Sequence, residues 1–237
     1  MILRRPRRCL CLLICGALSA AGLHAQTSTQ SPSSSSSSST KHVKKPAAST
    51  ESGIDNGSVV NGVYINKTLA LSCKIPPGWV LRTDELNARE EEKEEKKERD
   101  AAAQPPSTPA SSAGAKVLLA AFSRPPEARA EDVNASIVIA AESAASYPGL
   151  KEAAQYFFPL TEVAKAQGFT ADEDPYEIVI GTKTLVRGDF RKNVGRRVMR
   201  QSTLAMLSHG YAISITIIGG TDDEVEDLVD GLTFSLR

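Results

Sequence analysis

Hydrophobic positions recur along the chain with the spacing of strands in some segments and of helices in others. In TLALSCKI, residues 68–75, apolar residues alternate with polar or small ones, which predicts a strand with one buried face. Two continuous apolar runs, at 116–122 and 135–141, favour strands covered on both faces. Segment 176–219 reads as further strands divided by glycine-containing breaks, and alternation at 211–217 predicts one buried face for the last of them.

Two other segments have helical periodicity. Residues 148–168 place apolar side chains on one helical face, Pro159 is expected to kink or split this helix, and Gly168 is expected to cap it. Near the C-terminus, Thr221 and Glu224 form a capping-box pattern. The apolar residues that follow at helical spacing are Val225, Leu228, Val229 and Leu232.

Three positions are predicted to have structural roles at turns. Pro76 and Pro77 end the first strand because neither offers a backbone N–H to a sheet. Gly78 then allows the turn, and Trp79, the single tryptophan, is interpreted as a side chain that fills the corner rather than as a ligand platform. Gly210, after His209, fits a tight hairpin turn.

The N-terminus predicts export. Arginines precede an apolar run and small residues in MILRRPRRCLCLLICGALSAAGLHAQ, so 1–25 is expected to be a signal peptide. An apolar run of about 15 residues is short for a membrane span, which needs roughly 20. A periplasmic or secreted location is therefore expected, with no stable membrane span after cleavage. Tethering by an uncleaved signal, and a lipid on Cys15, are the alternatives.

A tether and an interrupted domain follow the signal. Residues 26–56 are rich in serine and poor in apolar residues, which predicts a disordered tether. The folded domain is expected over 57–237, with a charged, low-complexity insertion at 84–114. Thr83 offers a helix start, but the charged helix has no apolar stripe and is interpreted as a solvated insertion, or alternatively as an interaction arm.

Charge and residue inventory exclude several function classes. Loss of the four arginines in the signal leaves 24 basic against 28 acidic side chains, which argues against general nucleic-acid binding. Cys73 is the one cysteine outside the signal and is interpreted as a buried strand residue. His42 in the tether and His209 in a turn do not suit a catalytic triad. No cofactor motif or metal-ligand spacing is found, so the sequence predicts no cofactor, no metal and no enzyme.

One basic segment is the candidate binding site. Between 183 and 200, seven basic residues stand against a single acid, Asp189. A hairpin would concentrate positive potential suited to an envelope protein or an anionic surface. The alternative is a solvated face that discourages pairing between sheet edges. The candidate partner contacts are Arg187, Arg191, Lys192, Arg196, Arg197 and Arg200.

Three segments together resemble the PsbP-like fold family, which includes the extrinsic photosystem protein, a Ran-binding nuclear-import factor and small bacterial envelope proteins. They are NGVYINKTLALSCKIPPGWV at 61–80, strands ending in GYAISITII at 210–218, and DEVEDLVDGLTFSL at 223–236. The resemblance implies an α+β fold with a central antiparallel sheet and helices on both faces, an α/β/α sandwich. It implies binding or assembly without catalysis and transfers no catalytic residue.

Two hypotheses of function follow. The first is a non-catalytic exported module that binds a protein or assists envelope assembly. The second is a carrier that holds a small apolar or lipid ligand between the sheet and a helix. The oligomeric state is left open.

Overall fold

The computed structural model of the chain describes residues 53–101, 115–128 and 132–235. The predicted signal, nearly all of the predicted tether and residues 102–114 of the predicted insertion lie outside these residues. The described strands are β1 (Ser58–Val60), β2 (Val63–Asn66), β3 (Leu71–Lys74), β4 (Val80–Leu81), β5 (Lys116–Phe122), β6 (Ser136–Ser143), β7 (Thr170–Ala171), β8 (Tyr176–Ile180), β9 (Lys183–Val194), β10 (Arg197–Ser208), β11 (Tyr211–Gly219) and β12 (Leu232–Phe234). The helices are α1 (Thr83–Ala101), α2 (Ala153–Ala166) and α3 (Asp222–Asp230), with a short 3-10 helix η1 (Ala144–Ser146).

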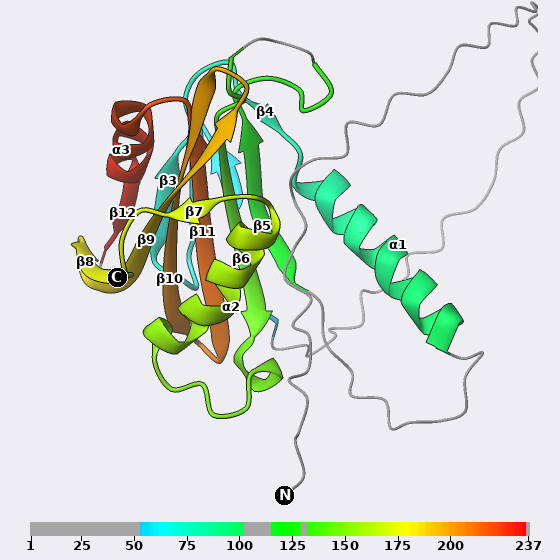
Figure 1. Ribbon diagram of the computed structural model, residues 1–237. Coiled ribbons are helices and arrows are strands. Elements are labelled where there is room, and N and C mark those ends of the chain that lie inside the picture. The colour runs from blue at the N-terminus through cyan, green and yellow to red at the C-terminus, as the bar shows by residue number, and fades with distance from the viewer. Residues whose placement is uncertain (1–52, 102–114, 129–131, 236–237) are drawn as a thin grey trace, which may run out of the picture. The chain divides into compact units, whose positions relative to one another are not determined.

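The larger sheet is antiparallel throughout, and β9, β10 and β11 follow one another in it as two consecutive hairpins. Its strand order is β4-β5-β6-β11-β10-β9-β7, and β8 also pairs with β9. The turn between β10 and β11 is formed by His209 and Gly210, whose φ values of 52° and 78° suit the two-residue hairpin expected there. The long β9–β10 hairpin turns at Gly195 and extends beyond the rest of the sheet (Figure 1).

The predicted α/β/α sandwich is wrong, because a second sheet forms the other layer. This four-stranded sheet has the order β1-β2-β3-β12. Its buried side chains, including Tyr64, Leu71 and Phe234, share one core cluster with Ile139 and Ile215 of the larger sheet. The fold is therefore mostly antiparallel β, with two packed sheets rather than one sheet flanked by helices on both faces.

The sequence interpretation missed the second sheet because its strands are short and one of them was taken as the end of a helix. Leu232 was counted with the last helix, but α3 ends at Asp230 and Leu232 begins β12. β12 pairs with β3, which lies about 160 positions earlier in the chain, so its partner is not visible in local periodicity. The start of α3 is as predicted, since the Thr221 side chain accepts a hydrogen bond of 3.1 Å from the Glu224 backbone N–H.

The opposite face of the larger sheet packs against α2. Phe157 lies over Gly188 of β9, where an added Cβ would come within 2.5 Å of the Phe157 ring. This cover buries β11 on both faces, so the expectation of one buried face for 211–217 is wrong. Pro159 does not split α2, which runs unbroken from Ala153 to Ala166, and Gly168 follows it with φ 87° as expected. Figure 1 shows α2 across this face and α3 on the other side of the sheet.

The first turns of helix α1 lie beside the β5 edge of the larger sheet. Thr83 Oγ1 accepts a hydrogen bond of 3.0 Å from the Ala120 N–H. The Asn87 side chain amide both accepts from the Val117 N–H and donates to the Val117 carbonyl, each at 2.9 Å. Asn87 thus replaces the peptide group of a neighbouring strand, and one helical turn of spacing brings Thr83 and Asn87 to the same side. These two side chains cover a strand edge that would otherwise be open to pairing.

Candidate functional site

The six candidate cations are divided between the two faces and the tip of the β9–β10 hairpin. Cross-strand register puts Arg187, Arg191 and Arg200 on the α3 side, and alternation puts Lys192 and Arg197 on the α2 side. Arg196 is exposed in the turn. The six candidate cations therefore lie on one hairpin but do not share one of its faces.

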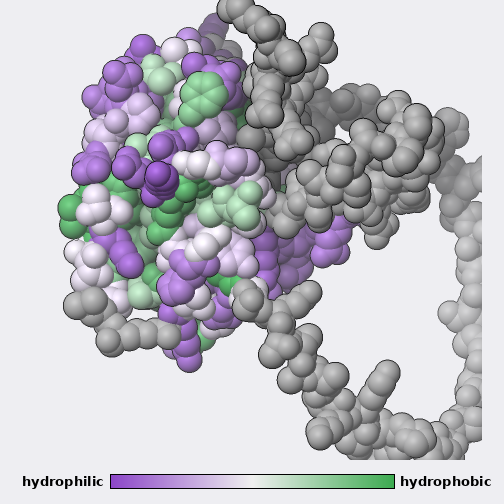
Figure 2. Space-filling view, turned by 90° about the horizontal axis from the view of Figure 1, so that it is seen from below, coloured by the Kyte–Doolittle hydropathy of each residue, from purple (hydrophilic) through white to green (hydrophobic). Residues whose placement is uncertain are grey.

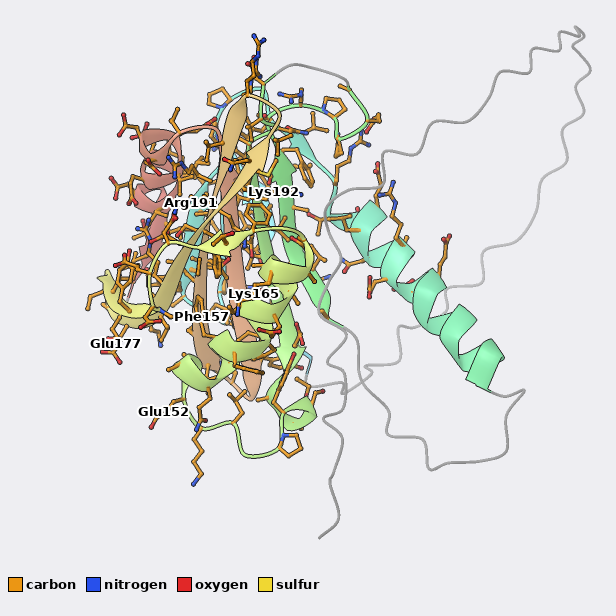
Figure 3. The ribbon with its side chains drawn as sticks, viewed as in Figure 1. Glu152, Phe157, Lys165, Glu177, Arg191 and Lys192 are labelled. Atoms are coloured by element: carbon orange, nitrogen blue, oxygen red, sulfur yellow. The ribbon has the colours of Figure 1, made fainter. Side chains whose placement is uncertain are left out.

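Five of the six also have polar partners within the chain. Arg191 Nε lies 3.1 Å from Asp172, Arg200 Nε lies 3.2 Å from Asp222, and Arg197 Nη1 lies 2.8 Å from Asp132. Lys192 Nζ donates to the Gln167 carbonyl at 2.7 Å and stands 5.6 Å from the centre of the Phe169 ring. Figure 3 labels Arg191 and Lys192 as neighbours on β9. Acidic residues from outside the hairpin compensate much of the charge that the segment carries.

Arg187 is the most deeply placed of the six and is 8% exposed. Its Nε donates to both carboxylate oxygens of Asp189, at 3.0 and 3.1 Å, and its Nη atoms contact Glu226 of α3. Burial by itself lowers the pKa of Arg187, but the hydrogen bonds and charge of Glu226 and Asp189 outweigh burial and raise it. The guanidinium stays charged and ties β9 to α3.

Tyr176 of β8 completes this network. Its hydroxyl donates to Asp189 Oδ2 at 2.8 Å. Burial, followed by the hydrogen bond to the Asp189 carboxylate and its charge, raises the pKa of Tyr176 to about 12. The hydroxyl is therefore a proton donor to Asp189 at neutral pH and not a base. The network connects β8, β9 and α3 through a single arginine.

An open cleft of about 240 Å³ lies beside this network. This volume is below the roughly 300–1,000 Å³ of typical small-molecule sites. Two of the candidate cations line it, Arg187 and Arg200, together with five carboxylates: Asp172, Glu173, Asp189, Asp222 and Glu226. Both arginines are paired with carboxylates, so the residues that line the cleft form a polar network that connects α3 to β9 and β10.

A second buried polar group, Glu142 of β6, lies on the α2 side. Tyr156 donates to Glu142 Oε1 at 2.9 Å, Tyr147 donates to Oε2, and the two rings meet edge to face at 5.2 Å. Burial raises the pKa of Glu142, the two tyrosine hydrogen bonds lower it, and the charge of Glu90 raises it; the net shift is upward. Glu142 anchors the segment that enters α2.

Strand β8 carries Val179, which is the most exposed large apolar side chain on the described strands. Within the described residues β8 pairs with β9 alone. Val179 is 72% exposed, and it lies on the α2 side because its neighbour Glu177 is paired with Val186 of the α2 cluster. Phe158 of α2, the helix that covers this face, is 74% exposed. Figure 3 shows Glu177 at the outer side of the β8–β9 ribbon, and Figure 2 shows hydrophobic residues reaching the surface between hydrophilic ones on the face seen from below.

The remaining predicted positions have these surroundings. Trp79 is half-buried and packs against the main core, and Gly78 before it has φ 83°. Cys73 is fully buried, and burial raises the pKa of its thiol to about 12, so it is not a nucleophile at neutral pH. His209 Nδ1 lies 2.8 Å from the Ser208 hydroxyl in the exposed turn. Between α2 and the larger sheet, Phe157 is packed against Gly188.

The sequence identified the basic residues of the β9–β10 hairpin but not the carboxylates that pair with them. Nothing in the local sequence indicated that Arg187 would meet Glu226, or that Arg200 would meet Asp222. Asn87 carried no signal at all, because an asparagine in a charged helix is ordinary. No group of three or more potential metal ligands is found within the described ranges, and none of the helices described there is long and apolar enough to cross a bilayer.

Comparisons with known proteins give little further information. No protein-family model matches the chain, and no curated protein matches it. Among solved structures, a protein of unknown function from Pseudomonas aeruginosa is 18% identical, with a TM-score of 0.31, over 43% of this chain and 68% of that one. LpqN from Mycobacterium tuberculosis, described as involved in cell envelope biogenesis, is 14% identical, with a TM-score of 0.34, over 70% of this chain and 83% of that one.

A structure from Bacteroides thetaiotaomicron is 11% identical, with a TM-score of 0.37, over 74% of this chain and 49% of that one. This chain therefore matches about half the length of that structure. All three TM-scores are below 0.5, so these similarities carry no argument about fold or function. None of the comparisons names the PsbP-like family, and the resemblance stays a prediction.

Proposed function

We propose that this protein is a non-catalytic exported module that binds another polypeptide along strand β8. The observation that carries the proposal is that β8 is paired on one side only and exposes Val179 at 72%. An unpaired strand edge presents backbone donors and acceptors that a further strand can use, and exposed apolar side chains add contact area. The arginine-rich start of the chain supports export.

The β8 edge supports this role better than the basic hairpin does. Five of the six hairpin cations are engaged with partners of the same chain, so their charge is less available to a partner. Val179, in contrast, belongs to a strand whose inner residues Ile178 and Ile180 pack against the core. The strand is thus held in place while its Glu177 and Val179 side chains are exposed.

A site-specific cross-link tests the proposal. A photo-reactive phenylalanine derivative replaces Val179 in the protein as expressed in its own host, and the matched control carries it at Val194, which is 47% exposed at the far end of β9. We expect a protein adduct from position 179 and none from position 194. Absence of an adduct at 179, or equal adducts from both positions, would refute the proposal.

A further inference from the structure

The backbone groups of β8 that point away from the sheet can be identified from its turn. Ile180 and Lys183 flank a two-residue turn, Gly181–Thr182, and Gly181 has φ 58°, as the first position of a type II′ hairpin requires. Ile180 and Lys183 therefore form a hydrogen-bonded pair. Since hydrogen-bonded pairs alternate with non-hydrogen-bonded pairs along an antiparallel ladder, Ile178 and Leu185 form the next hydrogen-bonded pair. It follows that the N–H and C=O groups of the alternate residues, Glu177 and Val179, face outward.

The outward backbone groups of β8 can form hydrogen bonds with the same groups of a second copy of this chain when the two strands pair in one antiparallel register. When Ile178 stands opposite Ile178 of a second copy, Glu177 of each copy stands opposite Val179 of the other. Both of these pairs can then exchange two backbone hydrogen bonds. The two Val179 side chains become diagonal neighbours about 7–8 Å apart, which covers part of the apolar surface that a single copy leaves exposed.

The charged residues before and after β8 also favour antiparallel over parallel pairing of the two copies. Glu173 and Asp174 precede the strand and are exposed, and Lys183 follows it after the turn. In an antiparallel pair the start of each strand lies beside the end of the other, so each acidic start lies at the same end of the joined sheet as the partner copy's Lys183 on β9. A parallel pairing would instead bring the two acidic starts together, which is unfavourable.

From these observations we infer that β8 pairs with β8 of a second copy of this chain about a two-fold axis at Ile178, joining two larger sheets into one. The inference rests on the proposed function and names its partner. A two-fold interface is the commonest arrangement of soluble oligomers, because one self-complementary surface serves both copies.

Cysteine trapping tests the register. Across the proposed axis the two residues at 178 form a non-hydrogen-bonded pair with Cα atoms about 4.5 Å apart, within the roughly 4.4–6.8 Å that a disulfide spans. Ile178→Cys is therefore expected to give a disulfide-linked dimer under mild oxidation. The matched control is Ile180→Cys, a half-buried position of the same strand whose two copies would be roughly 13 Å apart. Both variants keep the same native cysteines.

Sedimentation equilibrium and one blocking variant complete the test. The unmodified protein is expected to show a reversible monomer–dimer equilibrium. Val179→Pro removes an outward N–H without touching a bond to β9, so it is expected to weaken the dimer about tenfold or more while thermal unfolding of the monomer is unchanged. If Val179→Pro does not fold, the two cysteine variants still decide the question.

The outcomes separate the inference from the proposed function. Faster trapping at 178 than at 180, with a dimer in the unmodified protein, supports the inference. Equal trapping with a monomer at every concentration overturns it. A photo-adduct at Val179 with a different protein also overturns the inference, but leaves the proposed function standing. Absence of any adduct overturns the proposed function itself.

Discussion

Replacement of Asn87 by alanine is the sharpest test of how the β5 edge is protected. The Asn87 amide makes two hydrogen bonds of 2.9 Å to the Val117 N–H and carbonyl. Asn87→Ala leaves both of these partly buried backbone groups without their partner. An unsatisfied buried polar group costs about 1–3 kcal/mol, and partial water access puts each of these two near the lower end.

The expected loss is therefore about 2 kcal/mol from the two groups. Alanine recovers roughly 0.5 kcal/mol because it is the better helix former. The net destabilisation is about 1.5 kcal/mol, which corresponds to a fall in Tm of about 3–6 °C for a domain of this size. If α1 detaches without global unfolding, the loss appears instead as faster hydrogen exchange of the Val117 amide.

Two measurements distinguish global destabilisation from local detachment of α1. Denaturant unfolding is monitored by the fluorescence of Trp79, the single tryptophan, and amide exchange is measured at Val117. The control is Glu91→Ala, an exposed position one turn further along α1, which is expected to change neither quantity by more than about 0.5 kcal/mol. The explanation is refuted if Asn87→Ala behaves as the control does in both measurements.

Three other predictions concern buried groups. Gly188→Ala puts a Cβ 2.5 Å from the Phe157 ring, so we expect about 1–3 kcal/mol of destabilisation in denaturant unfolding; unchanged stability would show that α2 shifts freely. The raised pKa of Glu142 means that the folded protein binds more protons than the unfolded chain between the ordinary carboxyl pKa and the raised value. Stability should fall as pH rises through this window, and Glu142→Gln should remove that slope in unfolding curves measured at several pH values. The Cys73 thiol, with its pKa raised to about 12 by burial, should react with a disulfide reagent only as fast as the protein unfolds; rapid labelling of the native protein would contradict its burial.

The sequence alone predicted the elements whose stabilising partners are close in the chain. The hairpin turn at His209 and Gly210, the cap of α3 at Thr221 and the strands at 116–122 and 135–141 depend on local backbone preference or on continuous apolar runs. Such features leave a pattern within a few residues. The helix start at Thr83 was visible for the same reason.

The tertiary structure decided everything that required two distant segments to meet. β12 becomes a strand because β3 offers it a partner, and this pairing changes the predicted single sheet with helical layers into two packed sheets. Arg187 looked like a surface cation until Glu226 and Asp189 enclosed it. Asn87 gains its role from the position of Val117, thirty residues later. Periodicity records which side of an element is buried but not what covers it. For this protein the covering elements determine which charges are neutralised and which strand edges are left without a partner strand.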